Sequence, residues 1–166
     1  MAAALLLAAV PGCAFALSSD RQKPFHLEAD RAQIDHKTGV SVYRGNVQVS
    51  RGSMHLTGDT VTVYTDSDDH VNKVVAVGSP ATFRQRPDHK EQDVKGRAQR
   101  VEYFAAEDRV VLLDKARVWQ AGNTFRSDRI VYQVGRDVVN AGAGEGTGKA
   151  RVHITLPAKG NSAGGQ

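Results

Sequence analysis

The sequence is poor in cysteine, with Cys13 as the only one among 166 residues. A disulfide framework within the chain is therefore excluded, and the fold has to be stabilised by packing. Cys13 also lies in an apolar N-terminal segment with the character of an export signal. We expect the mature chain, without that segment, to have neither a disulfide nor thiol chemistry.

Aromatic residues are also scarce, at 6% of the chain, and amphipathic helical patterns are almost missing. Few windows place apolar residues at the three- and four-residue spacing of a helix. Valine-rich segments with alternating apolar and polar residues are frequent instead, for example residues 47–49, 61–63 and 150–156. Because alternation is typical of strands with one buried face, the sequence predicts an all-β fold.

Long apolar runs are missing after residue 16, where no stretch approaches the roughly 18 residues of a transmembrane helix. The one apolar run, residues 2–10, precedes a turn and the small residues Ala14 and Ala16. This arrangement is typical of a secretory signal peptide. We predict that residues 1–16 are removed, so that the exported protein begins at Leu17.

Two features of this segment leave alternatives open. No Lys or Arg precedes the apolar run, which favours a true start upstream of Met1. Acylation of Cys13, as in a lipoprotein, would give a membrane-tethered protein in place of a free one.

The motifs of common enzymes are missing as well. The sequence has no G-x-S-x-G and no H-E-x-x-H, and its six histidines are scattered singly. Asp66, Asp68 and Asp69 form a short acidic loop, but the glycine and closing glutamate of a calcium-binding loop are not there. We interpret this loop as a hairpin turn and expect a binding protein, with no enzymatic activity, cofactor or metal site.

The chain has a formal net charge of +4, which suits an anionic partner. Positive charge concentrates between residues 84 and 100, where aromatic side chains for base stacking are few, and export removes the protein from most nucleic acid. We therefore exclude nucleic acid and keep two interpretations, a solvated face or a rim that attracts phosphate. The basic residues concerned are Arg84, Arg86, Lys90, Lys95, Arg97 and Arg100.

An internal duplication is the most informative pattern of the sequence. A 69-residue shift of the sequence along itself places positions 29–34 on 98–103 and positions 56–61 on 125–130 without a gap. Positions 27–30 also resemble positions 56–59, at a spacing of 29. Four related units therefore follow one another along the chain, as in stacked-repeat folds.

In each unit the apolar alternation changes parity at the same place, which predicts a corner in the strand. The corners fall at Asp30, Asp59, Gln99 and Asp128, and we assign the recurring Asp30, Asp59 and Asp128 to folding. Stacked cornered units give two facing sheets, or one folded sheet, with a continuous apolar interior and two open ends. We predict one domain, residues 17–156, and a disordered polar tail, residues 157–166.

Several segments together resemble the OstA-like family of periplasmic lipopolysaccharide-transport proteins. The resemblance covers nearly the whole mature chain and is specific only when its segments are taken jointly. They are residues 23–30 (KPFHLEAD), 43–49 (YRGNVQV), 78–83 (GSPATF), 122–125 (GNTF) and 127–132 (SDRIVY).

This resemblance implies an antiparallel folded β-jellyroll whose open hydrophobic trough shelters the acyl chains of lipopolysaccharide. Because each buried methylene contributes about 0.8 kcal/mol, several acyl chains need a long apolar channel. From alternation and family position together, the trough is predicted to be lined by Phe25, Leu27, Ile34, Val49, Leu56, Val63, Phe83, Val101 and Tyr103.

The resemblance also implies partners in the periplasm: lipopolysaccharide, an inner-membrane-anchored OstA-like protein and the periplasmic domain of the outer-membrane lipopolysaccharide translocon. Both terminal segments alternate and so offer strand edges, which predicts head-to-tail self-association. The edges would be formed by Phe25 and Leu27 at one end and Val152 and Ile154 at the other. A structural β-repeat scaffold that binds no lipid is the remaining alternative.

Overall fold

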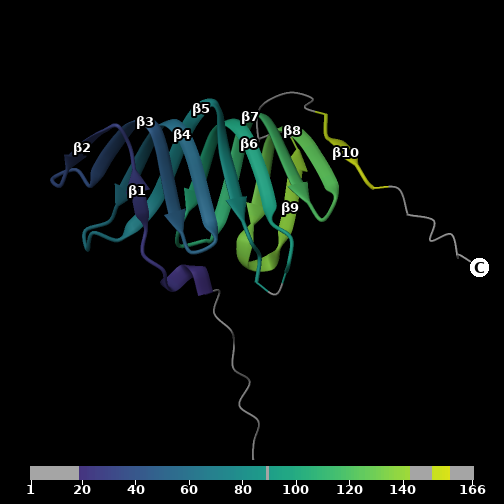
Figure 1. Cartoon of the computed structure of the whole chain (residues 1–166), viewed down its shortest axis with the longest axis horizontal. Coiled ribbons are helices and arrows are strands. Elements are labelled where there is room, and N and C mark those ends of the chain that lie inside the picture. The colour runs from purple at the N-terminus through teal and green to yellow at the C-terminus, as the bar shows by residue number, and fades with distance from the viewer. Residues whose placement is uncertain (1–18, 89, 143–150, 158–166) are drawn as a thin grey trace, which may run out of the picture.

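The computed structural model describes residues 19–88, 90–142 and 151–157 (Figure 1). The predicted signal peptide, its cleavage site, Cys13 and all but the first residue of the predicted tail lie outside these ranges. Helical structure within them is limited to two 3-10 turns, η1 (Ser19–Gln22) and η2 (Val134–Arg136). In the described part of the chain no helix is long and apolar enough to span a membrane.

All other regular elements of the described chain are strands in one antiparallel sheet, which confirms the all-β prediction. The sheet order is β1-β3-β4-β5-β6-β7-β8-β10, with β2 beside β3 and β9 beside β8. Figure 1 shows the strands following one another from β1 and β2 at one end to β10 at the other. The strands are β1 (His26–Glu28), β2 (Arg31–Asp35), β3 (Val40–Arg51), β4 (Met54–Thr65), β5 (Val71–Gln85), β6 (Val94–Phe104), β7 (Arg109–Gln120), β8 (Asn123–Gln133), β9 (Val138–Gly142) and β10 (His153–Thr155).

The sheet is bent along one line that crosses every long strand. Strand pairing is interrupted beside Asp59, Gln99 and Asp128, and Asp30 separates β1 from β2. All four predicted corners are therefore confirmed. The same line also crosses β3, β5 and β7, at residues 45–46, 78–80 and 114–115, where the alternation of the sequence gave no signal.

The internal duplication is present in the backbone. Under the shift found in the sequence, strand β3 falls on β7 from its first residue to its last, and both strands carry a bulge with positive φ at matching positions. The bulge residues are Gly45 (φ 82°) and Asn46 (φ 46°) in β3, and Asp114 (φ 63°) and Lys115 (φ 55°) in β7. Because this conformation is costly for residues with a Cβ, the second bulge is held by the surrounding sheet.

The bend divides the sheet into two facing leaves. The first leaf consists of β1, β10 and residues 47–57, 81–98 and 116–127 of the long strands. The second leaf consists of β2, β9 and residues 40–44, 60–77, 100–113 and 129–133. Apolar side chains of both leaves meet between them in one cluster, so the core lies inside the bend.

Candidate functional site

The interior face of the first leaf carries an apolar row that runs from edge to edge. Cross-strand partners in an antiparallel sheet project from the same face, so the pairing register defines this row directly. Its members, from the β1 edge to the β10 edge, are Leu27, Val49, Leu56, Phe83, Gly96, Val118, Phe125 and Ile154.

The second leaf carries two parallel rows that face the first. One is Ile34, Ser41, Val63, Val74, Tyr103, Val110, Tyr132 and Val139. The other is Ala32, Tyr43, Val61, Ala76, Val101, Leu112, Ile130 and Ala141. An almost continuous apolar interior therefore extends across the whole width of the sheet.

The predicted lining residues all belong to this interior, but they differ in exposure. Phe25 and Leu27 are partly buried against the core at the β1 edge. Ile34 is 54% exposed, because β2 is the last strand of the second leaf and nothing in the described chain covers it. The other six, all at most 5% exposed, are Val49, Leu56, Val63, Phe83, Val101 and Tyr103.

The centre of the interior is filled by side chains. The rings of Phe83 and Tyr132, from opposite leaves, lie 6.1 Å apart between centroids. A Cβ placed on Gly96 would come within 2.6 Å of the Leu112 Cδ2 atom of the other leaf. The interior is thus closely packed in the middle and exposed towards the strand edges, where Ile154 is 56% exposed.

A polar contact joins the leaves at their open side, near the β1 edge. The Arg51 guanidinium of the first leaf donates from Nη1 to the Tyr103 hydroxyl of the second, at 3.2 Å. The Tyr103 hydroxyl donates in turn to Oδ1 of Asp108, a carboxylate that is only 3% exposed. The same guanidinium lies 4.7 Å from the centroid of the Phe25 ring.

A second contact of the same kind lies further along the sheet. Gln120 of the first leaf donates from Nε2 to Oδ1 of Asp137 at 2.6 Å, and the Tyr132 hydroxyl donates to the same oxygen at 3.1 Å. We call these two groups the Asp108 clasp (Arg51, Tyr103, Asp108) and the Asp137 clasp (Gln120, Tyr132, Asp137). Sequence reasoning missed both, although Arg51 and Gln120 are related by the 69-residue shift.

The predicted association edges are strand edges in the structure. Among described residues β1 pairs with β3 alone and β10 pairs with β8 alone. Val152 and Ile154 are 38% and 56% exposed, whereas Leu27 is partly buried. The strands are shorter than the alternation predicted, because the corner at Asp30 divides the first edge and β10 contains only three residues.

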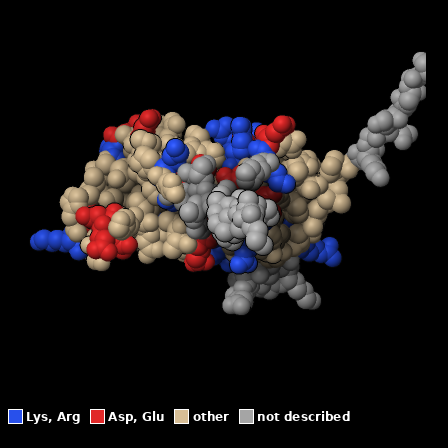
Figure 2. Space-filling model, turned by 90° about the horizontal axis from the view of Figure 1, so that it is seen from below, with Lys and Arg blue, Asp and Glu red and all other residues tan. Residues whose placement is uncertain are grey.

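The basic residues predicted between residues 84 and 100 divide between the two leaves, and several of them are paired with acids. Arg84 and Arg86 both pair with Asp93, at 3.6 and 2.9 Å, and Arg100 pairs with Glu102 at 2.6 Å. On the face seen from below, Figure 2 shows Lys and Arg in several separate groups, some of them next to acidic side chains. Arg84, Lys95 and Arg97 project from the outer face of the first leaf, where Arg84 and Lys95 are cross-strand partners, whereas Arg100 lies beyond the corner in the second leaf.

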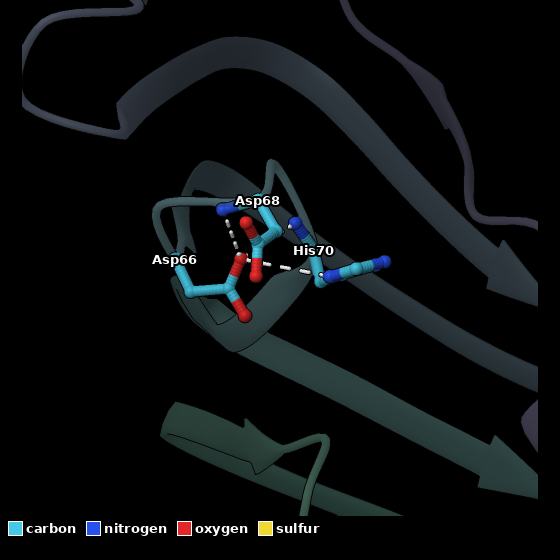
Figure 3. A group of neighbouring side chains, drawn as sticks. All are labelled: Asp66, Asp68 and His70. Atoms are coloured by element: carbon cyan, nitrogen blue, oxygen red, sulfur yellow. Dashed lines mark hydrogen bonds and ion pairs between the residues drawn. The ribbon is translucent and has the colours of Figure 1, made fainter.

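The acidic loop at residues 66–70 has the geometry of a capped hairpin turn (Figure 3). Oδ1 of Asp66 accepts hydrogen bonds from the backbone N–H groups of Asp68 and His70, both at 2.9 Å. The bond from His70 is the main cause that lowers the pKa of Asp66. Ligand atoms of Asp66, Asp68 and His70 lie within 4.8 Å of one another, but all three residues are exposed and the contacts serve the turn.

Comparison with known proteins places this architecture in a family. The family model described as "LptA/(LptD N-terminal domain) LPS transport protein" matches residues 26–138. The chain is 45% identical over 134 residues to the lipopolysaccharide export system protein LptH of Pseudomonas aeruginosa, covering 81% of this chain and 77% of LptH. It is 33% identical over 147 residues to LptA of Escherichia coli K12, covering 88% and 78% of the two chains.

A solved structure agrees with the sequence matches. The crystal structure of LptH from Pseudomonas aeruginosa, described as the LptA-homologous periplasmic component of the lipopolysaccharide transport device, superposes with a TM-score of 0.78. The two chains are 40% identical in this alignment, which covers 84% of this chain and 99% of the LptH chain. The folded, open antiparallel sheet is therefore shared with that protein.

Proposed function

The chain belongs to the family of lipopolysaccharide transport proteins that contains LptA and the N-terminal domain of LptD, and on this premise we propose that it is a periplasmic lipopolysaccharide carrier. The observation that carries the proposal is the apolar interior, whose rows run from one strand edge to the other. An extended channel of this kind suits acyl chains better than a closed pocket of fixed size. The protein catalyses no reaction in this role.

Acyl chains enter by separating the leaves. In the absence of lipid the interior side chains pack against one another, so the apolar surface stays out of water. The bend is open on the side of the two clasps, where hydrogen bonds, ring contacts and an ion pair of Lys90 with Asp137 at 3.9 Å join the leaves. Breaking them is compensated by burial of acyl methylenes, at about 0.8 kcal/mol each.

Head-to-tail stacking of copies extends the channel. The strands alternate in direction through the sheet order from β1 to β10, so β1 of a second copy placed beside β10 continues the antiparallel pattern. In this arrangement Ile154 of one copy adjoins Leu27 of the next, and the interior row is uninterrupted. Because the two edges differ, the contact is heterologous and gives open filaments.

At the ends of such a bridge we place two different partners. One edge meets an inner-membrane-anchored protein of the same fold, and the other meets the periplasmic domain of the outer-membrane translocon. A passive channel does not set the direction of movement, so an inner-membrane ATPase has to supply the energy.

Photo-crosslinking tests lipid binding directly. A photo-reactive residue is placed at Phe83, which projects into the interior, and in a matched variant at Gln48, which is outward and exposed. With purified lipopolysaccharide, the variant at residue 83 should crosslink and the variant at residue 48 should not. Crosslinking from residue 48 alone would reverse the assignment of the faces.

Extraction of lipid from the purified protein separates the carrier from the scaffold alternative. The close packing of the centre favours that alternative, since a scaffold needs a filled core and no ligand. Lipopolysaccharide recovered with the protein supports the carrier. Its absence, together with no uptake of added lipopolysaccharide, would leave the scaffold as the function.

A further inference from the structure

Three arginines lie side by side on the outer surface of the first leaf. Arg97 on β6 is the cross-strand partner of Arg117 on β7, and Arg117 is the cross-strand partner of Arg126 on β8. His153 on β10 pairs with Arg126 and extends the row to the sheet edge. Direct cross-strand partners have Cβ atoms about 4.5–5.5 Å apart, and like charges at this distance destabilise a sheet.

No acid in the described part of the chain forms an ion pair with any of the three arginines. Desolvation, and then repulsion by Arg126 and Arg97, lower the pKa of Arg117. The row borders a surface hollow of about 490 Å³, to which Lys115 also contributes. Asp128 is the one acidic residue in the described lining of this hollow.

The duplicated half of the chain shows that the fold does not require these charges. The 69-residue shift places Arg97, Arg117 and Arg126 on Glu28, Gln48 and Thr57, which are also consecutive cross-strand partners on the outer face. There the hydroxyls of Thr57 and Thr82 form a hydrogen bond at 2.6 Å, and Thr82 is in turn the cross-strand partner of Arg97, so the polar row leads directly into the arginine row. A polar, nearly neutral row thus builds the same sheet, and the arginine row needs another explanation.

Trp119 holds two of the guanidiniums against one surface. The centroid of its ring lies 5.6 Å from the Arg97 guanidinium carbon and 5.4 Å from that of Arg117. Cation–π contacts of this kind fix a guanidinium by its face. The N–H groups at the edge of the guanidinium plane stay available, and their geometry matches the oxygens of a phosphate.

We propose that Arg97, Arg117 and Arg126, with Lys115, form a binding site for a phosphoryl group on the outside of the first leaf. Adjacent strands are about 4.8 Å apart, so the row spans about 10 Å and accommodates one phosphate or a diphosphate. A bound dianion converts the mutual repulsion of the arginines into attraction to a shared ligand. The site is separate from the apolar interior, because outward and inward side chains of a strand project from opposite faces.

The single tryptophan of the chain reports on this site. Titration with inorganic pyrophosphate at constant ionic strength should change the Trp119 emission and saturate, whereas chloride at the same ionic strength should not. The variants Arg117→Gln and Arg126→Thr introduce the residues of the duplicated row and so preserve the fold. Arg126→Thr should weaken pyrophosphate binding roughly tenfold or more, through loss of charge-assisted hydrogen bonds. Arg44→Gln, with the same change of charge on the second leaf, should bind like the parent.

The source of the phosphate is decided by a second arm. Vesicles of phosphatidylglycerol are compared with vesicles of phosphatidylcholine by flotation, for the parent and for Arg126→Thr. Arginine-dependent binding of pyrophosphate supports a soluble phosphate ligand, and arginine-dependent binding to the anionic vesicles supports a lipid headgroup. Absence of saturation in both arms, or equal binding by Arg126→Thr and the parent, would overturn the site. Loss of thermal stability in Arg126→Thr would also count against it, since a site of mutual repulsion gains stability when one charge is removed.

Discussion

The Tyr103 hydroxyl donates a hydrogen bond to Oδ1 of Asp108, on the loop that follows its strand, at 3.1 Å. Tyr132 and Asp137 repeat this pair one sequence unit later at the same distance, and both aspartates have positive φ, 48° and 52°. The smaller repeat of the sequence therefore recurs as a hydrogen-bonded tyrosine–aspartate pair at the open side of the bend. Both pairs are bonded to the facing leaf, so they bear on stability and on access to the interior.

Replacement of Tyr103 by Phe tests the Asp108 clasp. The variant keeps the ring but removes one donor from a buried carboxylate and one acceptor from Arg51, so we expect a loss of about 1–3 kcal/mol in the free energy of unfolding. Urea denaturation measures it. Tyr64→Phe, at a tyrosine that is 37% exposed, is the control and should be close to neutral. Equal stability of the Tyr103 variant and the parent would show that the clasp does not join the leaves.

Alkaline pH should weaken the fold through the same tyrosines. Burial, and then the Asp108 carboxylate, raise the pKa of Tyr103 from its ordinary 10.0 to about 12, and burial and Asp137 raise the pKa of Tyr132. Because the folded state holds the proton more tightly, this stabilisation is complete below pH 10 and is lost as the pH rises towards 12. Urea unfolding measured between pH 8 and 12 should show a midpoint concentration that is constant up to about pH 10 and decreases above it. Tyr103→Phe should show a smaller fall.

Leu27→Asp places a charge at the entrance of the interior row. Leu27 is partly buried at the edge of the sheet, so the fold should survive while lipopolysaccharide binding weakens roughly tenfold or more. Glu28→Ala changes the next residue of the same strand, which is outward and exposed, and should leave binding unchanged. Circular dichroism establishes that both variants are folded, and a lipopolysaccharide binding assay compares them. Similar binding by both would remove Leu27 from the channel.

Ile154→Pro tests association through the β10 edge. Proline removes a backbone N–H and distorts the strand, so we expect a folded monomer at concentrations at which the parent forms larger species. Light scattering over a concentration series measures the mass. Ile154→Val keeps the N–H group and the β-branched side chain and should associate like the parent. A parent protein that stays monomeric at high concentration would contradict head-to-tail assembly, although lipid binding by single molecules would be unaffected.

Gly96→Ala tests the approach of the leaves at the centre of the interior. Its new Cβ would meet Leu112 Cδ2 at 2.6 Å, inside a fully packed core, and we expect about 1–3 kcal/mol of destabilisation. Leu112→Val shortens the opposing side chain. The double variant should therefore be more stable than the sum of the two single changes predicts, by about 0.5 kcal/mol or more. Strict additivity would mean that the two residues do not meet.

The sequence alone predicted the parts of the fold that depend on local pattern. Alternation identified the strands, because side chains of a strand alternate between faces whatever strand lies next to it. The changes of parity located the four corners at Asp30, Asp59, Gln99 and Asp128, since an unabsorbed slip would turn apolar side chains outward. The corner in β7 escaped prediction, because Asp114 and Lys115 adopt a conformation that polar residues with a Cβ rarely take without support from neighbouring strands.

By itself, then, the sequence determined the all-β class, the repeat and the inward side of each strand, because these follow from the order of residues along one chain. Register between strands and the closeness of the leaves were decided only by the tertiary structure. Arg97 and Arg126 are distant in sequence and meet on either side of Arg117 only when β6, β7 and β8 are paired. Arg84 and Arg86 are close to Arg97 in the basic segment of the sequence, yet both are paired with Asp93 in the fold. The interaction between two charges depends on their distance in space, and the pairing of strands sets that distance.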